Sequence, residues 1–231
     1  MIYDQLYMLT LVYAGGYDPR LKDNVRTLSH LVSTAISHSL TYNIISPHLP
    51  SSILDLLPAQ VPKDPQITFL LNFTTAQRSA LLSSPSTLAL LYTPANEHFG
   101  IAPIEAMACG IPVLACNSGG PMESIVSSPP HEAVERTGWL REPLPDVWAE
   151  CLMEIVSLDD AGRQRLSECA KRRAREKFSM EAMAEGLEGA LRDAEAMGEV
   201  DSWLFELLRV MIVVMVGFLL AYFASPLLIQ R

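Results

Sequence analysis

Short apolar runs alternate with amphipathic stretches along most of the chain. Five runs have the length and composition of buried strands: Leu9–Ala14, Ile67–Leu71, Leu88–Tyr92, Pro112–Cys116 and Gly138–Leu140. The stretches between them place apolar residues at helical intervals in Asn24–Leu40, in the segment that follows Phe73, in Ile101–Cys109 and in Met122–Val126. Because strands that alternate with helices form parallel β-α units, the pattern predicts an α/β fold with a doubly wound parallel sheet.

The pattern changes after Pro145, where only helices are expected. Apolar periodicity predicts helices in Asp146–Ser157, Ala161–Lys177 and Met180–Met197, and a polar loop is expected at Ser127–Glu132. Val210–Ile229 then contains twenty residues without a charge, or about 30 Å of helix, close to the hydrocarbon thickness of a bilayer. These features predict a domain over residues 1–200 and a hydrophobic, membrane-spanning segment over residues 203–229. An interfacial helix and a buried core helix are the alternatives for that segment.

Composition and charge narrow the class of partner. The 231 residues carry a net charge of −9, with a pI of about 5.0, so nucleic-acid binding is not expected. The basic run Lys171–Lys177 contains apolar residues at intervals and is interpreted as the solvated face of a helix. The four cysteines lack metal-ligand spacing, which predicts reduced core thiols in a cytosolic protein. No secretory signal opens the chain, so Asn72, in an Asn-Phe-Thr glycosylation pattern, is expected to stay unmodified.

Two glutamates eight residues apart, Glu97 and Glu105, lie where a predicted strand gives way to a predicted helix. In open α/β sheets, ligands bind beyond the carboxyl ends of the strands, where Glu97 falls. Gly100 lets backbone approach a ligand, and free N–H groups at the start of the helix favour an anion such as a diphosphate. An ionised carboxylate early in a helix can accept hydrogen bonds from neighbouring sugar hydroxyls. The residues therefore predict a sugar-nucleotide site, with a helix cap at Glu97 and a solvent-facing Glu105 as the alternative.

A longer stretch of sequence supports the sugar-nucleotide interpretation. The segment EHFGIAPIEAMACGIPVLACNSGGPMESIV resembles the region of retaining GT-B glycosyltransferases of family four in which seven residues separate two glutamates. TFLLNFTTAQRSALLSSPSTLALLYTP before it, and GWL and REKFSMEAMA after it, follow the order of the family. The resemblance covers most of residues 10–190. In AGGYD, NFTTAQRSALLSSPSTLALLYTPANEHFGI and SGGPMESI the chain is similar to the mannosyltransferases of dolichol-linked oligosaccharide assembly. The resemblance implies a Rossmann-like C-terminal half of a GT-B fold, followed by a hydrophobic helix.

The resemblance also implies site residues. It places Glu97 beside the donor sugar as the catalytic residue, and it gives Glu105 the ribose hydroxyls. Further donor-binding residues are implied: Phe99, Gly100 and Ile101 in a turn that faces sugar and phosphate, and Asn72 and Phe73 in a loop near the base. Gly15 and Gly16 are implied in a glycine turn near the phosphates, and Gly119 and Gly120 form a second glycine pair. The last pair equally fits a tight turn without ligand contact. His98 stands where the family often has glycine, and it is either a ligand contact or a side chain packed on the next loop.

The implied reaction is transfer of mannose with retention at the anomeric carbon. The implied donor is GDP-mannose. The implied acceptor is a dolichol-diphosphate-linked mannosyl-chitobiose, which receives an α-1,3 and then an α-1,6 mannose in N-glycan precursor assembly. The family needs no metal ion or other cofactor, because positive groups and helix N-termini stabilise the leaving diphosphate. The resemblance further implies a protein of the endoplasmic reticulum membrane, with its catalytic domain facing the cytosol, that associates with other glycosyltransferases.

One departure from the family lies ahead of Gly15. GT-B enzymes have two Rossmann-like halves, and this chain matches the C-terminal, donor-binding half alone. The Arg/Lys pair with which the family neutralises the diphosphate has no match before Gly15, because Arg20 and Lys22 come after the strand. A truncated mannosyltransferase that retains donor recognition is therefore expected. The alternatives are a UDP-sugar-dependent transferase of the same family and a non-catalytic, membrane-anchored partner subunit that binds a sugar nucleotide.

Overall fold

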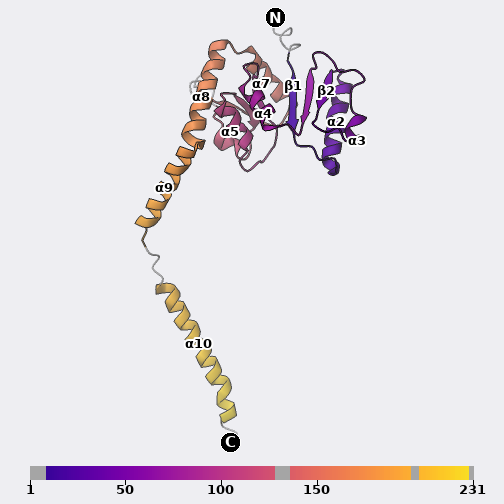
Figure 1. Cartoon of the computed structure of the whole chain (residues 1–231). Helices are drawn as coiled ribbons and strands as arrows, with labels where there is room; N and C mark the ends of the chain where they lie inside the picture. Colours follow the sequence, from indigo (N-terminus) through magenta and orange to yellow (C-terminus); the bar gives the residue numbers. More distant parts are fainter. Residues whose placement is uncertain (1–8, 128–135, 199–202, 229–231) are drawn as a thin grey trace. The chain divides into compact units, whose positions relative to one another are not determined.

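The computed structural model describes residues 9–127, 136–198 and 203–228 (Figure 1). The chain forms two compact units, Met1–Ser179 and Met180–Arg231. The first unit combines parallel strands with flanking helices, whereas the second is helical where it is described. The α/β class that the alternating pattern predicts is therefore confirmed.

The first sheet has three parallel strands in the order β1-β3-β2, with β1 at Leu11–Gly15, β2 at Tyr42–Ile45 and β3 at Ile67–Leu71. The register pairs Gly15 with Leu71, so β1 and β3 end side by side. Helix α2 (Lys22–Ser37) covers this sheet because its buried residues recur at helical spacing, namely Leu28, Val32 and Ala35. The short helix α3 (Ser51–Leu54) adds Ile53 to the same core.

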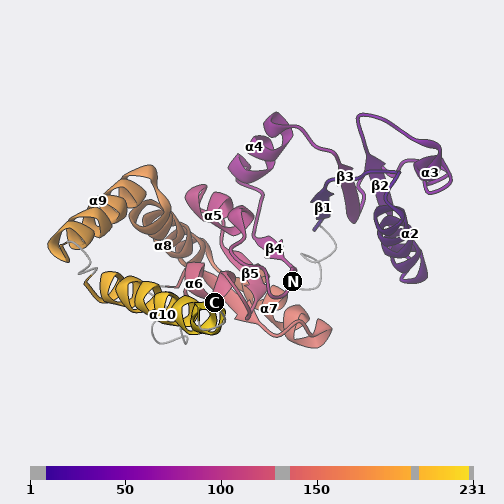
Figure 2. The same ribbon diagram turned by 90° about the horizontal axis from the view of Figure 1, so that it is seen from below.

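The second sheet also has three parallel strands, in the order β4-β5-β6, with β4 at Leu90–Tyr92, β5 at Val113–Cys116 and β6 at Gly138–Arg141. Figure 2 shows β5 beside β4. All residues of β5 are buried, because helices cover both of its faces. Val113 and Ala115 pack in one core with α5 (Ile101–Ala108) and α8 (Asp160–Phe178). Leu114 packs in the other core with α7 (Pro145–Ser157).

Two further helices follow strand ends in the first unit. Helix α4 (Thr75–Ser83) comes after β3, and its N-cap is Thr74. The Thr74 side chain accepts from the N–H of Gln77, whose side chain accepts from the N–H of Thr74, so the start of α4 is fixed by a capping box. Helix α6 (Pro121–Ser124) comes after β5 and begins directly behind Gly120.

The strands fall into two sheets in the part of the chain that the structure describes. β1 and β4 each pair on one side, with β3 and β5 respectively. All strand pairs are parallel, as predicted, but one continuous doubly wound sheet is not formed. The exposure of β1 agrees with a strand at an edge, because Leu11 and Tyr13 are 36% and 38% exposed.

The second unit contains α9 (Met180–Ala196) and α10 (Trp203–Leu228). The segment for which the sequence predicts a hydrophobic helix is helical as α10, which carries an ion pair between Glu206 and Arg209 near its start. Among the described residues, however, no helix is long and apolar enough to cross a membrane, so the prediction of a spanning segment is not supported. Ile229 at the predicted end of that segment, and residues 128–132 of the predicted polar loop, lie outside the described residues.

Candidate functional site

Most candidate residues follow the carboxyl ends of β4 and β5. Glu97 lies in the loop after β4 and Gly120 in the loop after β5, and because these strands are parallel neighbours, both loops lie at one edge of the sheet. Two hydrogen bonds join the loops. The N–H of Asn96 donates to Oγ of Ser118 over 3.0 Å, and the N–H of Gly120 donates to the carbonyl oxygen of Glu97 over 2.7 Å. The loop after β5 thus fixes the backbone that carries Glu97.

The close approach of these loops requires Gly119 and Gly120. Gly119 has a φ of +63°, and a Cβ at this position would overlap the carbonyl oxygen of Glu97. Gly120 has an ordinary φ of −56°, but a Cβ there would overlap the backbone of Phe99 and approach the carbonyl oxygen of His98 to 2.7 Å. The two glycines therefore let one loop pack directly on the backbone of the other.

Arg173 of α8 also binds the segment after Gly120. Its Nε donates to the carbonyl oxygen of Ser124 over 2.6 Å, and its Nη2 donates to that of Glu123 over 2.7 Å. A guanidinium at these carbonyls caps the C-terminal end of α6 and complements the helix dipole. The basic run Lys171–Lys177 is helical, as predicted, but Arg173 differs from a purely solvated residue because it supports the loop that fixes Glu97.

Helix α5 begins at the centre of the candidate site. Its N-cap is Gly100, with a φ of +81°, where a Cβ would lie 2.9 Å from the hydroxyl oxygen of Tyr92. Burial, and secondarily the charge of Glu97, raise the pKa of Tyr92, so the Glu97 carboxylate lies within electrostatic reach of this hydroxyl. Pro103 is buried in the first turn, where its missing N–H is not needed. The Tyr92 hydroxyl therefore lies close to the N-terminus of α5 and senses the charge of Glu97.

The turn between Glu97 and α5 presents apolar side chains. Phe99 and Ile101 are 47% and 68% exposed, and His98 is exposed as well. The ring of Phe99 meets that of Phe178, at the end of α8, in an edge-to-face arrangement with ring centroids 6.0 Å apart. Sequence reasoning did not single out Phe178, although its place at the end of a long amphipathic helix was a usable signal.

Glu105 lies one turn further along α5 and is paired with a residue that sequence reasoning missed. Nη1 of Arg78, on α4, lies 2.8 Å from Oε1 of Glu105. The two side chains are 43% and 30% exposed, so the pair is partly shielded from solvent. Glu105 is therefore neither a free solvent-facing carboxylate nor a buried one.

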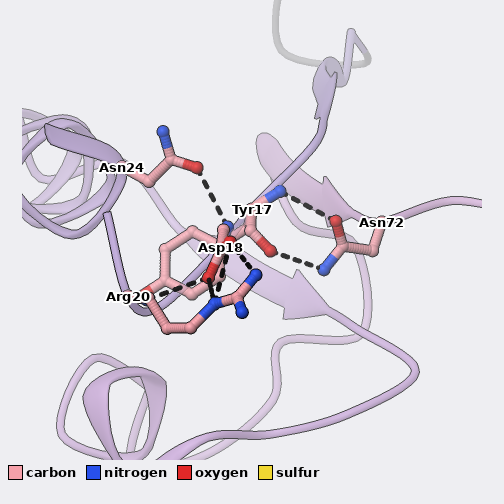
Figure 3. Close-up of polar contacts among 5 residues, drawn as sticks. All are labelled: Tyr17, Asp18, Arg20, Asn24 and Asn72. Atoms are coloured by element: carbon pink, nitrogen blue, oxygen red, sulfur yellow. Dashed lines mark hydrogen bonds and ion pairs between the residues drawn. The ribbon is translucent and has the colours of Figure 1, made fainter. Parts of the chain in front are cut away.

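The remaining candidates lie at the ends of β1 and β3, and Figure 3 shows Asn72 among them with its partner Tyr17. Asn72 has a φ of +51° and is held by the backbone of Tyr17: the N–H of Tyr17 donates to Oδ1 over 2.8 Å, and Nδ2 donates to the carbonyl oxygen of Tyr17 over 2.8 Å. The N–H of Asn72 donates to the carbonyl oxygen of Gly15 over 2.8 Å. A Cβ at Gly15 or Gly16 would meet nothing within 4 Å, so packing does not require glycine at either position.

The loop after β1 also contains a local ion pair, between Asp18 and Arg20. Nη2 of Arg20 lies 2.7 Å from Oδ2 of Asp18, and both Nε and the N–H of Arg20 donate to Oδ1. These hydrogen bonds lower the pKa of Asp18 to about 2. The N–H of Asp18 donates to Oδ1 of Asn24 over 2.9 Å. Arg20 is thus engaged within its own loop.

The candidates form two groups. Glu97 to Ile101, Glu105, Gly119 and Gly120 surround the start of α5, whereas Gly15, Gly16, Asn72 and Phe73 lie at the end of the first sheet. Phe73 is half-buried directly before α4. Helix α4 follows the second group along the chain, and α5 follows Glu97. The Arg78–Glu105 pair therefore connects the two helices that come after the two groups.

A cavity of about 230 Å³ lies away from both groups. Residues that precede β4 and β5 line it, among them Thr87, Leu88, Gly110 and Pro112. It therefore opens at the amino ends of these strands and contains none of the candidate residues. No cluster of three or more His, Cys, Asp or Glu that could hold a metal ion occurs within the described ranges. Among the described residues, none of the four cysteines forms a disulfide; Cys109 is exposed and the other three are buried.

The site and the fold define an α/β protein whose candidate ligand residues gather at the carboxyl ends of parallel strands. Residues 58–173, half of the chain, match the family described as glycosyl transferases group 1. The chain belongs to this family, and the family resemblance read from the sequence is confirmed.

Two curated relatives are named α-1,3/1,6-mannosyltransferase ALG2. The protein of Rhizomucor pusillus is 38% identical over 185 residues, and that of Saccharomyces cerevisiae is 37% identical over 179 residues. The alignments cover 80% and 77% of this chain but 37% and 35% of the relatives, so the chain spans little more than a third of their length.

Solved structures show the same fold. Sucrose-phosphate synthase from Thermosynechococcus elongatus is similar with a TM-score of 0.56 at 22% identity, over 85% of this chain and 42% of that protein. Anabaena Alr3699/HepE, solved in complex with UDP, is similar with a TM-score of 0.51 at 18% identity, over 83% of this chain and 44% of that protein.

Proposed function

We propose that this chain is the donor-binding part of a retaining α-1,3/1,6-mannosyltransferase that uses GDP-mannose. The relatives of 38% and 37% identity support the mannosyltransferase assignment. The observation that carries the proposal for this site is the packing of Gly119 and Gly120 on the backbone of Glu97 and Phe99. It gives a carboxylate and the N-terminus of α5 one fixed frame, as a preorganised ligand site requires.

In the proposed reaction, the bond between the anomeric carbon of mannose and the β-phosphate oxygen breaks, and its electron pair stays with GDP. The acceptor hydroxyl oxygen forms the new bond on the same face of the sugar, and its proton passes to the departing β-phosphate oxygen of GDP. N–H groups at the start of α5 stabilise the charge that develops on the diphosphate. Glu97 lies beside the mannose, where a carboxylate stabilises positive charge at the anomeric carbon.

The proposed role of Glu105 is to hold the nucleoside. An ionised carboxylate accepts hydrogen bonds and donates none, so it suits the neighbouring hydroxyls of a ribose. The partial exposure of Glu105 keeps its carboxylate accessible to such a ligand. Phe73 and Asn72, ahead of α4, are proposed on the side of the base, and Gly15 and Gly16 on the side of the phosphates.

The acceptor proposed for the whole enzyme is a dolichol-linked oligosaccharide, and the proposed location is the cytosolic face of the endoplasmic reticulum membrane. An enzyme with a lipid-linked acceptor has to act at a membrane surface. If its domain faces the cytosol, Asn72 carries no glycan. Treatment of the native protein with a glycan-removing enzyme tests this location, since a mobility shift that Asn72→Gln abolishes contradicts it. Association with other glycosyltransferases and independence of metal ions remain predictions.

Calorimetric titration of the purified chain with GDP, GDP-mannose, UDP and UDP-N-acetylglucosamine tests the donor. Guanine nucleotides are expected to bind at least about tenfold more tightly than uridine nucleotides. Glu105→Gln should weaken GDP binding by about ten- to a hundredfold, because hydrogen bonds to charged groups contribute about 1.5–3 kcal/mol. Glu185→Gln, on the exposed surface of α9, is the matched control.

The outcomes separate the alternatives. Tighter binding of uridine nucleotides would favour a UDP-sugar-dependent transferase. Absence of binding by every nucleotide would contradict both the proposed donor site and the non-catalytic sugar-nucleotide-binding subunit. Equal binding of GDP by the wild type and Glu105→Gln would remove Glu105 from the site.

A further inference from the structure

The ion pair between Arg78 and Glu105 links two helices that contribute to different sides of the donor site. Arg78 is on α4, which follows the loop of Asn72 and Phe73, whereas Glu105 is on α5, which follows Glu97. Nη1 of Arg78 lies 2.8 Å from Oε1 of Glu105. In the described part of the chain, no other ion pair or hydrogen bond engages the side chain of Glu105, so Oε2 is free to accept from a ligand.

The position of Arg78 is set by its own helix. The capping box of Thr74 and Gln77 fixes where α4 begins, and the N–H of Arg78 donates to the carbonyl oxygen of Thr74 over 3.0 Å. Asn72 lies two residues before this cap, and two hydrogen bonds hold it against the backbone of Tyr17. The backbone of Arg78 is therefore fixed relative to the end of β3. Through the ion pair, Arg78 in turn restricts where the carboxylate of Glu105 can lie.

Stability alone is a weak reason for this pair. Partly exposed ion pairs contribute little to the free energy of unfolding, because solvent screens them and two long side chains lose rotational freedom. Helix α4 has no buried residue, so the pair does not complete a core. A ligand that needs the Glu105 carboxylate in one orientation benefits from this pair. Because the side chain is already ordered before the ligand binds, binding costs less conformational entropy.

We propose that Arg78 is a positioning residue of the donor site, which orients the Glu105 carboxylate for the hydroxyls of the nucleoside ribose. This inference rests on the proposed function. By occupying Oε1, Arg78 fixes the rotamer of Glu105 and leaves Oε2 for the sugar. Arg78 acts through Glu105 and so determines how well the site distinguishes a ribose from a sugar without hydroxyls.

The test compares GDP with 2′,3′-dideoxy-GDP, which differ only in the ribose hydroxyls, as ligands of the full chain. The wild type is expected to prefer GDP, and Glu105→Gln is expected to lose this preference. Arg78→Ala should weaken GDP binding by about three- to tenfold, as expected when one side chain must be ordered on binding, with little effect on the dideoxy nucleotide. Arg78→Lys should restore part of the preference. Arg78→Ala combined with Glu105→Gln should bind GDP no more weakly than Glu105→Gln alone, because the two residues act as one unit.

Arg192→Ala is the matched control. Arg192 pairs with Glu188 over 3.1 Å on the second unit, at exposures of 77% and 66%, so its loss should leave both nucleotides unaffected. If Arg78 has a purely structural role, Arg78→Ala weakens the binding of GDP and of the dideoxy nucleotide equally. That result overturns the inference but leaves the proposed donor site intact. A wild type that binds GDP and the dideoxy nucleotide equally would instead contradict the assignment of Glu105 to the ribose, and the inference with it.

Discussion

The backbone N–H of Gly120 donates a hydrogen bond of 2.7 Å to the carbonyl oxygen of Glu97. This bond joins the loops after β4 and β5, and the absence of a side chain at position 120 makes it possible, since a Cβ would overlap the backbone of Phe99. The orientation of Glu97 thus depends on a residue 23 positions further along the chain that has no functional group of its own.

Gly120→Ala should lower the free energy of unfolding by about 1–3 kcal/mol, the usual effect of inserting a methyl group into a filled space. The φ of −56° at Gly120 suits alanine, so the effect is steric rather than conformational. Urea unfolding measures it. Gly186→Ala, in α9, is the control, because a Cβ there meets nothing within 4 Å and alanine favours helix. Equal stability of wild type and Gly120→Ala would show that the two loops separate easily.

Asn72 should be more sensitive to alanine than to glycine. Either substitution removes the two hydrogen bonds to Tyr17, at about 1–3 kcal/mol in total. Alanine adds the strain of the left-handed φ of +51°, about 1–2 kcal/mol, which glycine avoids. In urea unfolding, the free energy of unfolding is expected to be highest for the wild type, lower for Asn72→Gly and lowest for Asn72→Ala. The reverse order of the two variants would contradict the backbone geometry.

The Asp18–Arg20 pair gives the chain a specific response to acid. Because its hydrogen bonds with Arg20 lower the folded-state pKa of Asp18 to about 2, below the value of about 3.9 for an unfolded chain, ionised Asp18 stabilises the fold above about pH 4. That contribution is lost as the pH falls from about 4 through 2. A carboxyl NMR titration should give a midpoint near 2 in the wild type and near the ordinary value in Arg20→Ala. The stability difference between these proteins should shrink over the same interval, and a constant difference would contradict the pairing.

The cysteines should differ sharply in reactivity. Burial raises the pKa of Cys151 to about 11, and the nearby charge of Glu154 acts in the same direction while Arg141 and Arg136 oppose it. Cys109 is exposed, so at pH 8 a maleimide reagent is expected to label it first. Mass spectrometry of the labelled chain should find one fast site, which Cys109→Ser removes. Labelling of Cys151 at the rate of Cys109 would show that the core around α7 opens readily.

The sequence predicts elements best where the local pattern is strong. The run Ile67–Leu71 has the bounds of β3, and the helix expected after Phe73 is present as α4, because the patterns that predict both elements are local. Strand β2 escapes prediction because Tyr42–Ile45 is four residues long and contains Asn43. It is a strand because β3 offers hydrogen bonds beside it, and such tertiary context leaves no mark in its own residues.

The place of the candidate residues at the strand ends was predictable from the sequence, but their contacts were not. The spacing of Glu97 and Glu105, and the glycines around them, directs attention to the segment that the structure gathers at the strand ends. Arg78 and Phe178 reach this segment from helices that begin elsewhere in the sequence, and a single sequence does not reveal which face of a helix meets which neighbour. The support that Arg173 gives to α6 is hidden for the same reason, since it lies within a run of charges that suggests solvent.

The edge position of β1 affects how the chain behaves in solution. Within the described residues β1 pairs with β3 alone, so no strand pairs with the backbone N–H and C=O groups on its other side, and Leu11 and Tyr13 are exposed on this strand. Edges of this kind are templates for edge-to-edge aggregation, and a charged side chain, lysine above all, is one of the devices by which natural proteins block them. Solubility at high concentration is thus expected to be limited by this edge, and Tyr13→Lys is the substitution expected to raise it.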